Sequence, residues 1–126
     1  MRYAGIDYGK KRVGVALSDE GLSFALPKVV LPNDRMLVKK IAEFCKENDV
    51  SLIVVGESLN YKNEENAIME EAKDFAKKIS GVTGVNVVFE PEFLTSAEAE
   101  RVQGKNKMHD ASAAAIILKS YMAKNK

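Results

Sequence analysis

An uninterrupted apolar run at residues 51–56, Ser-Leu-Ile-Val-Val-Gly, is the feature that most narrows the possible folds. A strand with one solvated face alternates apolar and polar residues, whereas the interior of this run is apolar throughout. Such runs are typical of central strands in sheets that carry helices on both faces. Apolar residues at helical spacing precede it at 37–45 and follow it at 68–79. The run therefore predicts an α/β protein.

The remaining patterns predict the element order βββαβαβαα. We expect a mixed five-stranded sheet flanked by helices, with the first three strands antiparallel. Right-handed crossovers would place strand 51–56 beside the first strand and the last strand beyond it. Asn33 or Asp34 is expected to cap the first helix, and Gly81 to end the second. The other expected elements are strands 2–8, 12–18, 28–31 and 85–89, a short helix from the capping box at Thr95 to Glu98, and a final helix over about 110–123.

Length and composition predict one domain over residues 1–126 with a single core, because 46% of the residues are apolar. Cys45 is the only cysteine, which excludes an intrachain disulfide and favours a reducing compartment. Its place in the apolar stripe of helix 37–45 predicts a buried thiol. No long apolar segment precedes Asp7, and the run 111–118 is too short to cross a bilayer. We therefore expect a cytoplasmic protein without membrane contact.

Positive charge gathers at the two ends of the chain, although the net charge is only +1. Residues 1–12 carry four basic side chains against Asp7, and residues 101–126 carry six against Asp110. The segment between them is therefore acidic overall. If the two ends meet in space, they form a basic face suited to a polyanion such as nucleic acid. The alternative is that these lysines and arginines only keep the termini soluble.

Three acidic residues are expected to converge at one end of the sheet. Asp7 ends the first strand on the face shared with Tyr3 and Gly5, and Glu92 follows the last strand. Asp110 heads the apolar stripe of the final helix. Taken singly, each has a structural alternative, as a hairpin cap, a solvated loop acid and a helix N-cap respectively.

Clustered carboxylates repel one another unless a cation lies among them, and Mg²⁺ suits such a donor set, with Mn²⁺ as an alternative. Two such ions about 3.5–4 Å apart can activate a water and stabilise the leaving oxygen in phosphodiester hydrolysis. Basic residues flank both acidic segments, as a phosphate-rich substrate requires. They are Lys10, Lys11 and Arg12 after Asp7, and Lys105 and Lys107 before Asp110.

Two motifs at opposite ends of the chain resemble the YqgF (RuvX-like) family. They are GIDYGKKRVGVA at 5–16 and HDASAAAIIL at 109–118. The resemblance extends over essentially the whole chain and implies a ribonuclease H-like fold. The family is described as Holliday junction resolvases or as nucleases that trim the small-subunit rRNA precursor. The resemblance implies that Asp7, Glu92 and Asp110 are the catalytic, metal-binding acids.

The same resemblance implies that Lys10, Arg12 and the Lys105/Lys107 loop contact phosphates, while Gly9 permits a tight turn and close approach of the nucleic acid. Two departures from the family pattern stand out. Phe93 replaces the arginine that usually follows the acid of the last strand. Glu57 adds an acid after Gly56, as an extra metal ligand or a substitute for Glu92.

These observations predict a magnesium-dependent nuclease acting on structured nucleic acid, and the family resemblance implies that it processes the 5′ end of the pre-16S rRNA. We expect a monomer or a weak homodimer. Alternatives are a dimeric Holliday junction resolvase, a nucleic-acid-binding module without catalysis, and an ATP-binding fragment of the actin and sugar-kinase type. His109 is either a proton donor or a half-exposed residue before a helix, and Tyr8 either stacks on a base or packs at the sheet edge.

Overall fold

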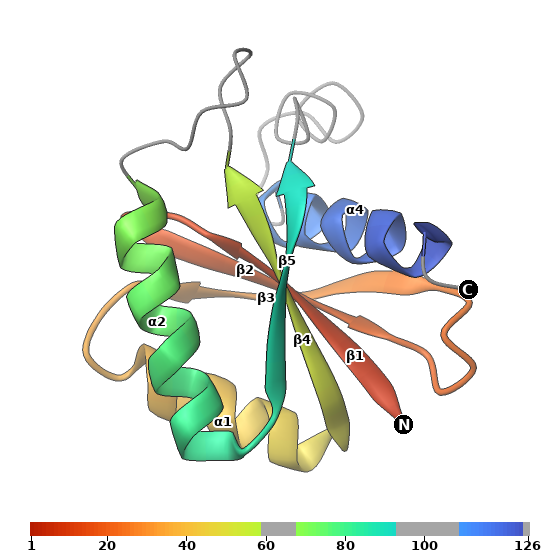
Figure 1. Cartoon of the computed structure of the whole chain (residues 1–126), viewed down its shortest axis with the longest axis horizontal. Coiled ribbons are helices and arrows are strands. Elements are labelled where there is room, and N and C mark those ends of the chain that lie inside the picture. Colours follow the sequence, from red (N-terminus) through yellow and green to blue (C-terminus); the bar gives the residue numbers. More distant parts are fainter. Residues whose placement is uncertain (59–67, 93–108, 125–126) are drawn as a thin grey trace.

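Five strands, labelled in Figure 1, form one sheet. Their order in the sheet is β3-β2-β1-β4-β5. The computed structural model describes residues 1–58, 68–92 and 109–124. The strands are β1 (Arg2–Tyr8), β2 (Arg12–Ser18), β3 (Ala25–Pro32), β4 (Val50–Ser58) and β5 (Asn86–Glu92). The helices are α1 (Leu37–Glu47), α2 (Ile68–Thr83) and α4 (His109–Lys124). The short helix expected from Thr95 lies outside the described residues.

The pairing confirms the predicted mixed sheet. β1 pairs antiparallel with β2, and β2 with β3, while β1, β4 and β5 run parallel. β4 lies beside β1 and β5 beyond it, as right-handed crossovers require. The carboxyl ends of the three parallel strands therefore share one edge of the sheet, where open α/β sheets bind their ligands.

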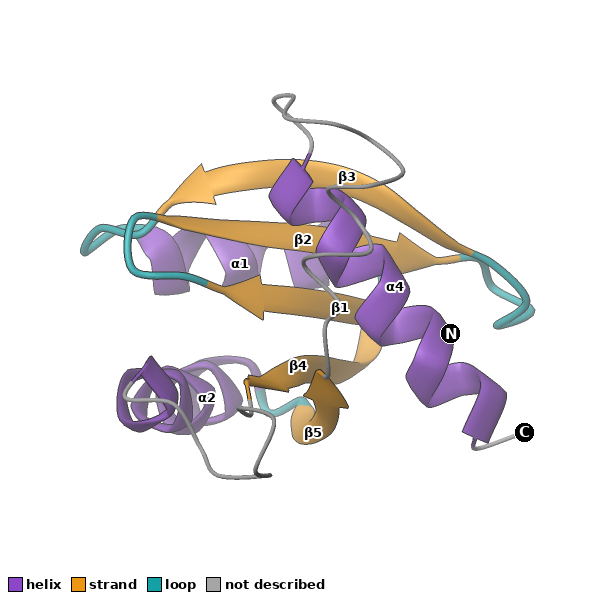
Figure 2. Ribbon diagram, turned by 90° about the horizontal axis from the view of Figure 1, so that it is seen from above, coloured by secondary structure: helices purple, strands orange, loops and turns teal. Residues whose placement is uncertain are grey.

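Helices cover both faces of the sheet (Figure 2). One face packs against α1 and α2, through a core that includes Ile6, Ile41 and Ile79. The other face packs against α4, through Ala16, Val54 and Leu118 among others. This explains the uninterrupted apolar run of β4, because its alternate side chains enter two different cores.

Small residues let α4 lie close to the sheet. A Cβ added to Gly5 would stand only 2.6 Å from the backbone oxygen of Ala114 and 2.8 Å from Cβ of Leu118. Ala16 lies opposite Gly5 on β2 and is fully buried. The alanine-rich first half of α4 matches this small-residue surface, since Ala111, Ala113 and Ala114 are also fully buried.

Two predicted helix boundaries are wrong. The N-cap of α1 is Met36, without a side-chain cap bond, and Asp34 instead accepts a hydrogen bond from the Met36 N–H at 2.9 Å in the preceding turn. Gly81 lies inside α2, which continues to Thr83. Gly84 follows with a φ of 74°, the left-handed conformation that ends many helices.

No helix in the described part of the chain is long and apolar enough to span a membrane.

Candidate metal and nucleic-acid site

Asp7 lies at the carboxyl end of β1, on the face covered by α4. Tyr3 on the same face meets Tyr121 of α4 with ring centroids 6.1 Å apart, and Gly5 meets Ala114 and Leu118. Strand alternation carries Asp7 onto this face two residues later. Its side chain is half-buried at the edge of the sheet. The predicted facing of Tyr3, Gly5 and Asp7 is confirmed.

The contacts between β1 and α4 run in opposite directions along the two elements. From Tyr3 to Gly5 on the strand, the partners step back from Tyr121 to Ala114 on the helix. Asp7 is the next residue on this face of β1, and the first turn of α4 precedes Ala114. Asp110 lies in that turn, four residues before Ala114, at the second position of the helix. Only the backbone of Asp110 is described.

Strand alternation separates Glu92 from Glu57. Val88 packs in the core beneath α4, and the Glu90 side chain contacts α4, so Glu92 continues that series on β5. On β4, Ile53 and Val55 pack in the core on the α1 and α2 side, and Glu57 continues that series. Glu92 is thus placed in the backbone series of Asp7's face, and Glu57 in the series of the opposite face. The Glu92 side chain is outside the described part.

Glu90 is a buried acid that sequence analysis did not single out. Its side chain is 4% exposed, and Oε2 accepts hydrogen bonds from Ser120 Oγ at 2.8 Å and from Lys124 Nζ at 2.7 Å. Both donors are on α4, so the carboxylate ties β5 to the end of that helix. The sequence signal was its position. Glu90 is the next residue after Val88 on the same face of an otherwise apolar strand.

The basic turn between β1 and β2 stands at the same edge as Asp7. Lys10, Lys11 and Arg12 are exposed there, within reach of solvent and ligand. A Cβ on Gly9 would lie 2.6 Å from the Arg12 backbone oxygen, so the turn is too tight for a larger residue. This supports the role expected for Gly9 in a close turn. Lys105 and Lys107 lie outside the described residues.

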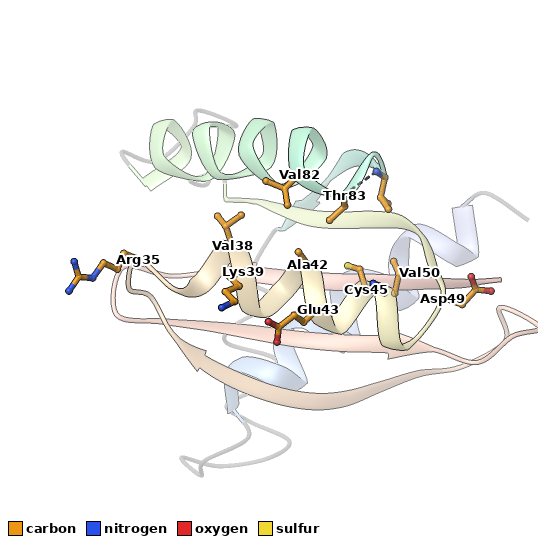
Figure 3. A pocket seen from close by; sticks show the side chains of 12 residues that line it. Arg35, Val38, Lys39, Ala42, Glu43, Cys45, Asp49, Val50, Val82 and Thr83 are labelled. Atoms are coloured by element: carbon orange, nitrogen blue, oxygen red, sulfur yellow. Dashed lines mark hydrogen bonds between the residues drawn. The ribbon is translucent and has the colours of Figure 1, made fainter.

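The other side of the sheet carries a hollow of about 780 Å³ between α1 and the end of α2. Figure 3 shows Val38, Ala42 and Cys45 lining it from α1, with Val82 and Thr83 facing them from α2. Cys45 is 3% exposed, and burial raises the pKa of its thiol to about 11, which confirms the predicted core thiol. Tyr8 packs on Phe75 on this same side, with ring centroids 5.2 Å apart.

Among the side chains described, no three His, Cys, Asp or Glu residues gather closely enough to hold a metal ion. The Asp7 side chain is among those described. Of Glu92, His109 and Asp110, only the backbone is described. The described contacts place Ala114 of α4 against Gly5, two residues before Asp7, and the first turn of α4 precedes Ala114 along the helix. The basic turn follows β1 directly.

Comparison with solved structures identifies the fold. The chain is similar to Thermus thermophilus RuvC in complex with a Holliday junction substrate, with a TM-score of 0.67 and 20% identity over 99% of this chain and 95% of that one. It is similar to the fowlpox virus resolvase bound to Holliday junction DNA, with a TM-score of 0.61 and 12% identity over 99% of each chain. These likenesses establish a RuvC-like, ribonuclease H-like fold.

A sugar-kinase likeness is weaker and partial. The chain matches a ROK hexokinase from Thermus thermophilus with a TM-score of 0.50, but it covers only 38% of that protein. This likeness agrees with a shared core sheet.

Sequence relatives identify the family. The chain is 36% identical over 132 residues to a protein of Syntrophus aciditrophicus named "Putative pre-16S rRNA nuclease", covering 97% of this chain and 88% of that one. A protein of the same name from Anaeromyxobacter is 38% identical, with 97% and 96% covered. The family model described as "RuvX: Holliday junction resolvase" matches residues 1–124. The chain therefore belongs to the RuvX family of nucleases.

Proposed function

We propose that this protein is a divalent-metal-dependent nuclease that processes the 5′ end of precursor 16S rRNA in the cytoplasm, through a single domain over residues 1–126. The names of its sequence relatives support the substrate class. Mg²⁺ is the proposed cation, with Mn²⁺ as a substitute. Asp7, Glu92 and Asp110 are the proposed catalytic acids, with the basic turn at Gly9–Arg12 and Lys105 and Lys107 as substrate contacts.

The observation that carries this proposal is the packing of α4 across β1. Gly5 packs against Ala114, and Asp110 lies four residues before Ala114 in the first turn of the helix, which supports a position of that turn near the end of the strand containing Asp7. Asp7 and Asp110 are more than a hundred positions apart in sequence. The apolar packing between α4 and β1 does not by itself require an acid at Asp7 or at Asp110. A cation bound between the two elements would require acids at both positions.

The donor chemistry of these residues fits a hard divalent cation. Asp7 offers a half-buried carboxylate at the edge of the sheet, and Glu92 and Asp110 bring the same donor type on elements that end or begin there. Carboxylate oxygens are the preferred protein ligands of Mg²⁺, which keeps water or substrate phosphate oxygens as its other ligands. Alternation on β4 and β5 favours Glu92 over Glu57 for this role.

Each group of residues has a separate task in the reaction. When bound, the cation would neutralise the clustered carboxylates and stabilise the charge that develops on the scissile phosphate. Asp7, Glu92 and Asp110 hold it at a fixed place relative to the sheet. The exposed lysines of the turn neutralise phosphates on either side of the scissile bond and orient the strand. The low mobility of a β-strand end suits the positioning of Asp7.

A second candidate function is resolution of four-way DNA junctions. The description of the matching family and the junction-bound solved relatives favour it. A resolvase must cut two strands symmetrically, which calls for two sites related by a two-fold axis and hence a dimer.

The test is the variant Asp7→Asn, assayed on a labelled precursor of the 16S 5′ end and on a four-way DNA junction. We expect cleavage of the precursor by the wild type in Mg²⁺, loss of cleavage on chelation, and its absence in Asp7→Asn. The unfolding free energy should change by less than about 1 kcal/mol, because Asp7 lies at the edge of the sheet. Asp74→Asn on the exposed face of α2 is the matched control and should cleave normally.

Cleavage retained by Asp7→Asn, in a preparation free of contaminating nuclease, would contradict the assignment. Tight binding of the precursor by the wild type without metal-dependent turnover would indicate a binding module instead. Selective, paired cuts in the junction would favour the resolvase.

A further inference from the structure

Asn33 connects two segments that neither the sequence nor the family motif relates. It follows the last residue of β3, Pro32, and lies 24 positions from Gly9. Its side-chain Nδ2 donates to the Gly9 carbonyl at 2.7 Å, and its backbone N–H donates to the Lys11 carbonyl at 2.9 Å. Figure 2 shows the loop after β1 lying beside the end of β3, where these bonds form.

We propose that Asn33 is a positioning residue that holds the Gly9–Arg12 turn in a shape able to bind substrate phosphate. This inference rests on the proposed nuclease function. The bond lengths are those of ordinary strong hydrogen bonds, and both are made to carbonyls of the turn itself. The turn is thereby attached to β3 at two successive points.

The junction that carries Asn33 is itself well fixed. Pro32 pairs with Arg12 across the β2–β3 ladder, and the Asp34 N–H donates to the Pro32 carbonyl at 3.1 Å. Asp34 in turn accepts the Met36 N–H with its side chain and the Leu37 N–H with its backbone oxygen. Asn33 is thus held between the end of a strand and the start of α1, which makes it a rigid support.

The direction of the two bonds determines what the turn presents to a ligand. The N–H and C=O of a planar trans peptide point in opposite directions. Because the Gly9 carbonyl points to Asn33, the Lys10 N–H of the same peptide points away from β3. Lys10 and Lys11 are also exposed. An outward backbone amide beside lysine ammonium groups suits a phosphate oxygen.

The test compares Asn33→Ala and Asn33→Asp with Asn48→Ala. Asn48 is the matched control, because its Nδ2 also donates to a backbone carbonyl, that of Phe44 at 2.9 Å, but at the far end of α1. Hydrogen exchange at the amides of residues 9–12 reports the turn directly. Binding to an RNA hairpin is measured in chelator, and cleavage is measured in Mg²⁺.

We expect both Asn33 variants to exchange faster at residues 9–12 and to bind the hairpin about five- to tenfold more weakly, the ratio that the loss of one ordinary hydrogen bond gives. The dissociation constant and KM should rise together while kcat at saturation stays within about twofold of the wild type, because the lost support acts on binding. Asn48→Ala should leave exchange in the turn, affinity and KM unchanged.

Unchanged exchange in the turn, or unchanged affinity, would overturn the role of Asn33. A fall in kcat at constant KM would also overturn it, because Asn33 would then act on the reacting groups. A wild-type chain that binds no RNA would overturn the proposed function together with the phosphate role of the turn. Wild-type binding that the Asn33 variants leave intact would overturn only the inference about Asn33.

Discussion

Glu57 and Glu92 occupy backbone positions of opposite alternation on two neighbouring strands. Glu57 pairs with Pro91 in the parallel β4–β5 ladder, and Ser58 pairs with Glu92. The residues before Glu57 on its face, Val55 and Ile53, pack toward α1 and α2. Alternation therefore assigns Glu57 to the side of the sheet opposite the one that Gly5 and Asp7 share. At the residue scale, alternation therefore supports the preference for Glu92 over Glu57 that the family resemblance implies.

Glu92→Gln should lower kcat by at least about a hundredfold, because a lost metal ligand costs several kcal/mol of transition-state stabilisation. Glu57→Gln, the matched control on the opposite face, should keep kcat within about threefold of the wild type. Both are measured on the same precursor RNA at saturating Mg²⁺. The reverse ranking, with Glu57→Gln inactive and Glu92→Gln active, would contradict the assignment of Glu92.

At the scale of elements, the position of α4 depends on the absence of a side chain at Gly5. The Ala114 oxygen and Leu118 Cβ both belong to the helix, so neither can move without displacing α4. Glu90, bonded to Ser120 and Lys124, fixes the opposite end of the same helix. A shift of α4 would therefore carry the turn containing Asp110 away from β1.

Gly5→Ala should lower the unfolding free energy by about 1–3 kcal/mol, the usual cost of overpacking, and should reduce cleavage as well. Gly81→Ala is the control within α2, where an added Cβ meets nothing within 4 Å. It should raise the unfolding free energy by about 0.5–1 kcal/mol, because alanine is the better helix former, and leave cleavage unchanged. Denaturant unfolding measures the unfolding free energy of both variants, and the precursor RNA assay measures their cleavage. A Gly5→Ala variant as stable and active as the wild type would contradict the close packing of α4.

The elements themselves were largely predictable, because hydrophobic periodicity reports which faces are buried. Strands 2–8 and 12–18 were expected at their observed bounds, and the sheet order followed from crossover handedness. The end of α2 was not predicted correctly. Gly81 and Gly84 are both possible helix ends, and only tertiary context decides which of them takes the left-handed conformation. The start of α1 was also predicted wrongly. The Asp34 side chain accepts the Met36 N–H in the turn before the helix and does not cap the helix itself.

The candidate site was predictable only in part. Asp7 was placed correctly on the α4 face by simple alternation. The facing of Glu57 could not be read from the sequence, because a run buried on both faces carries no polar alternation to mark its register. The sequence marked Asn33 only as a possible helix cap and not as a partner of the turn, since its partners are the carbonyls of Gly9 and Lys11, and backbone acceptors have no sequence signature.

At the scale of the whole molecule, the first strand and the last helix of the chain pack together. Tyr3 and Tyr121 are in contact, and α4 crosses β1 and β2, so the termini are on one side of the sheet. Most of the chain between them is acidic by composition. If the proposed function holds, we expect a phosphate-rich strand to be attracted to the exposed Lys10 and Lys11 and repelled by the acidic segment.

This arrangement gives one chain one complete set of proposed acids, which leads to the last prediction. Cleavage of a single RNA strand needs one such set, whereas junction resolution needs two on a two-fold axis. We expect the protein to sediment at the monomer mass of 13.9 kDa under assay conditions and to cleave precursor RNA at a rate per chain that does not depend on protein concentration. A rate per chain that rises with concentration, in step with the fraction of dimer seen by sedimentation, would contradict monomeric processing and favour the resolvase. Parallel assays of the RNA precursor and the four-way junction, over the same range of concentration, distinguish these outcomes.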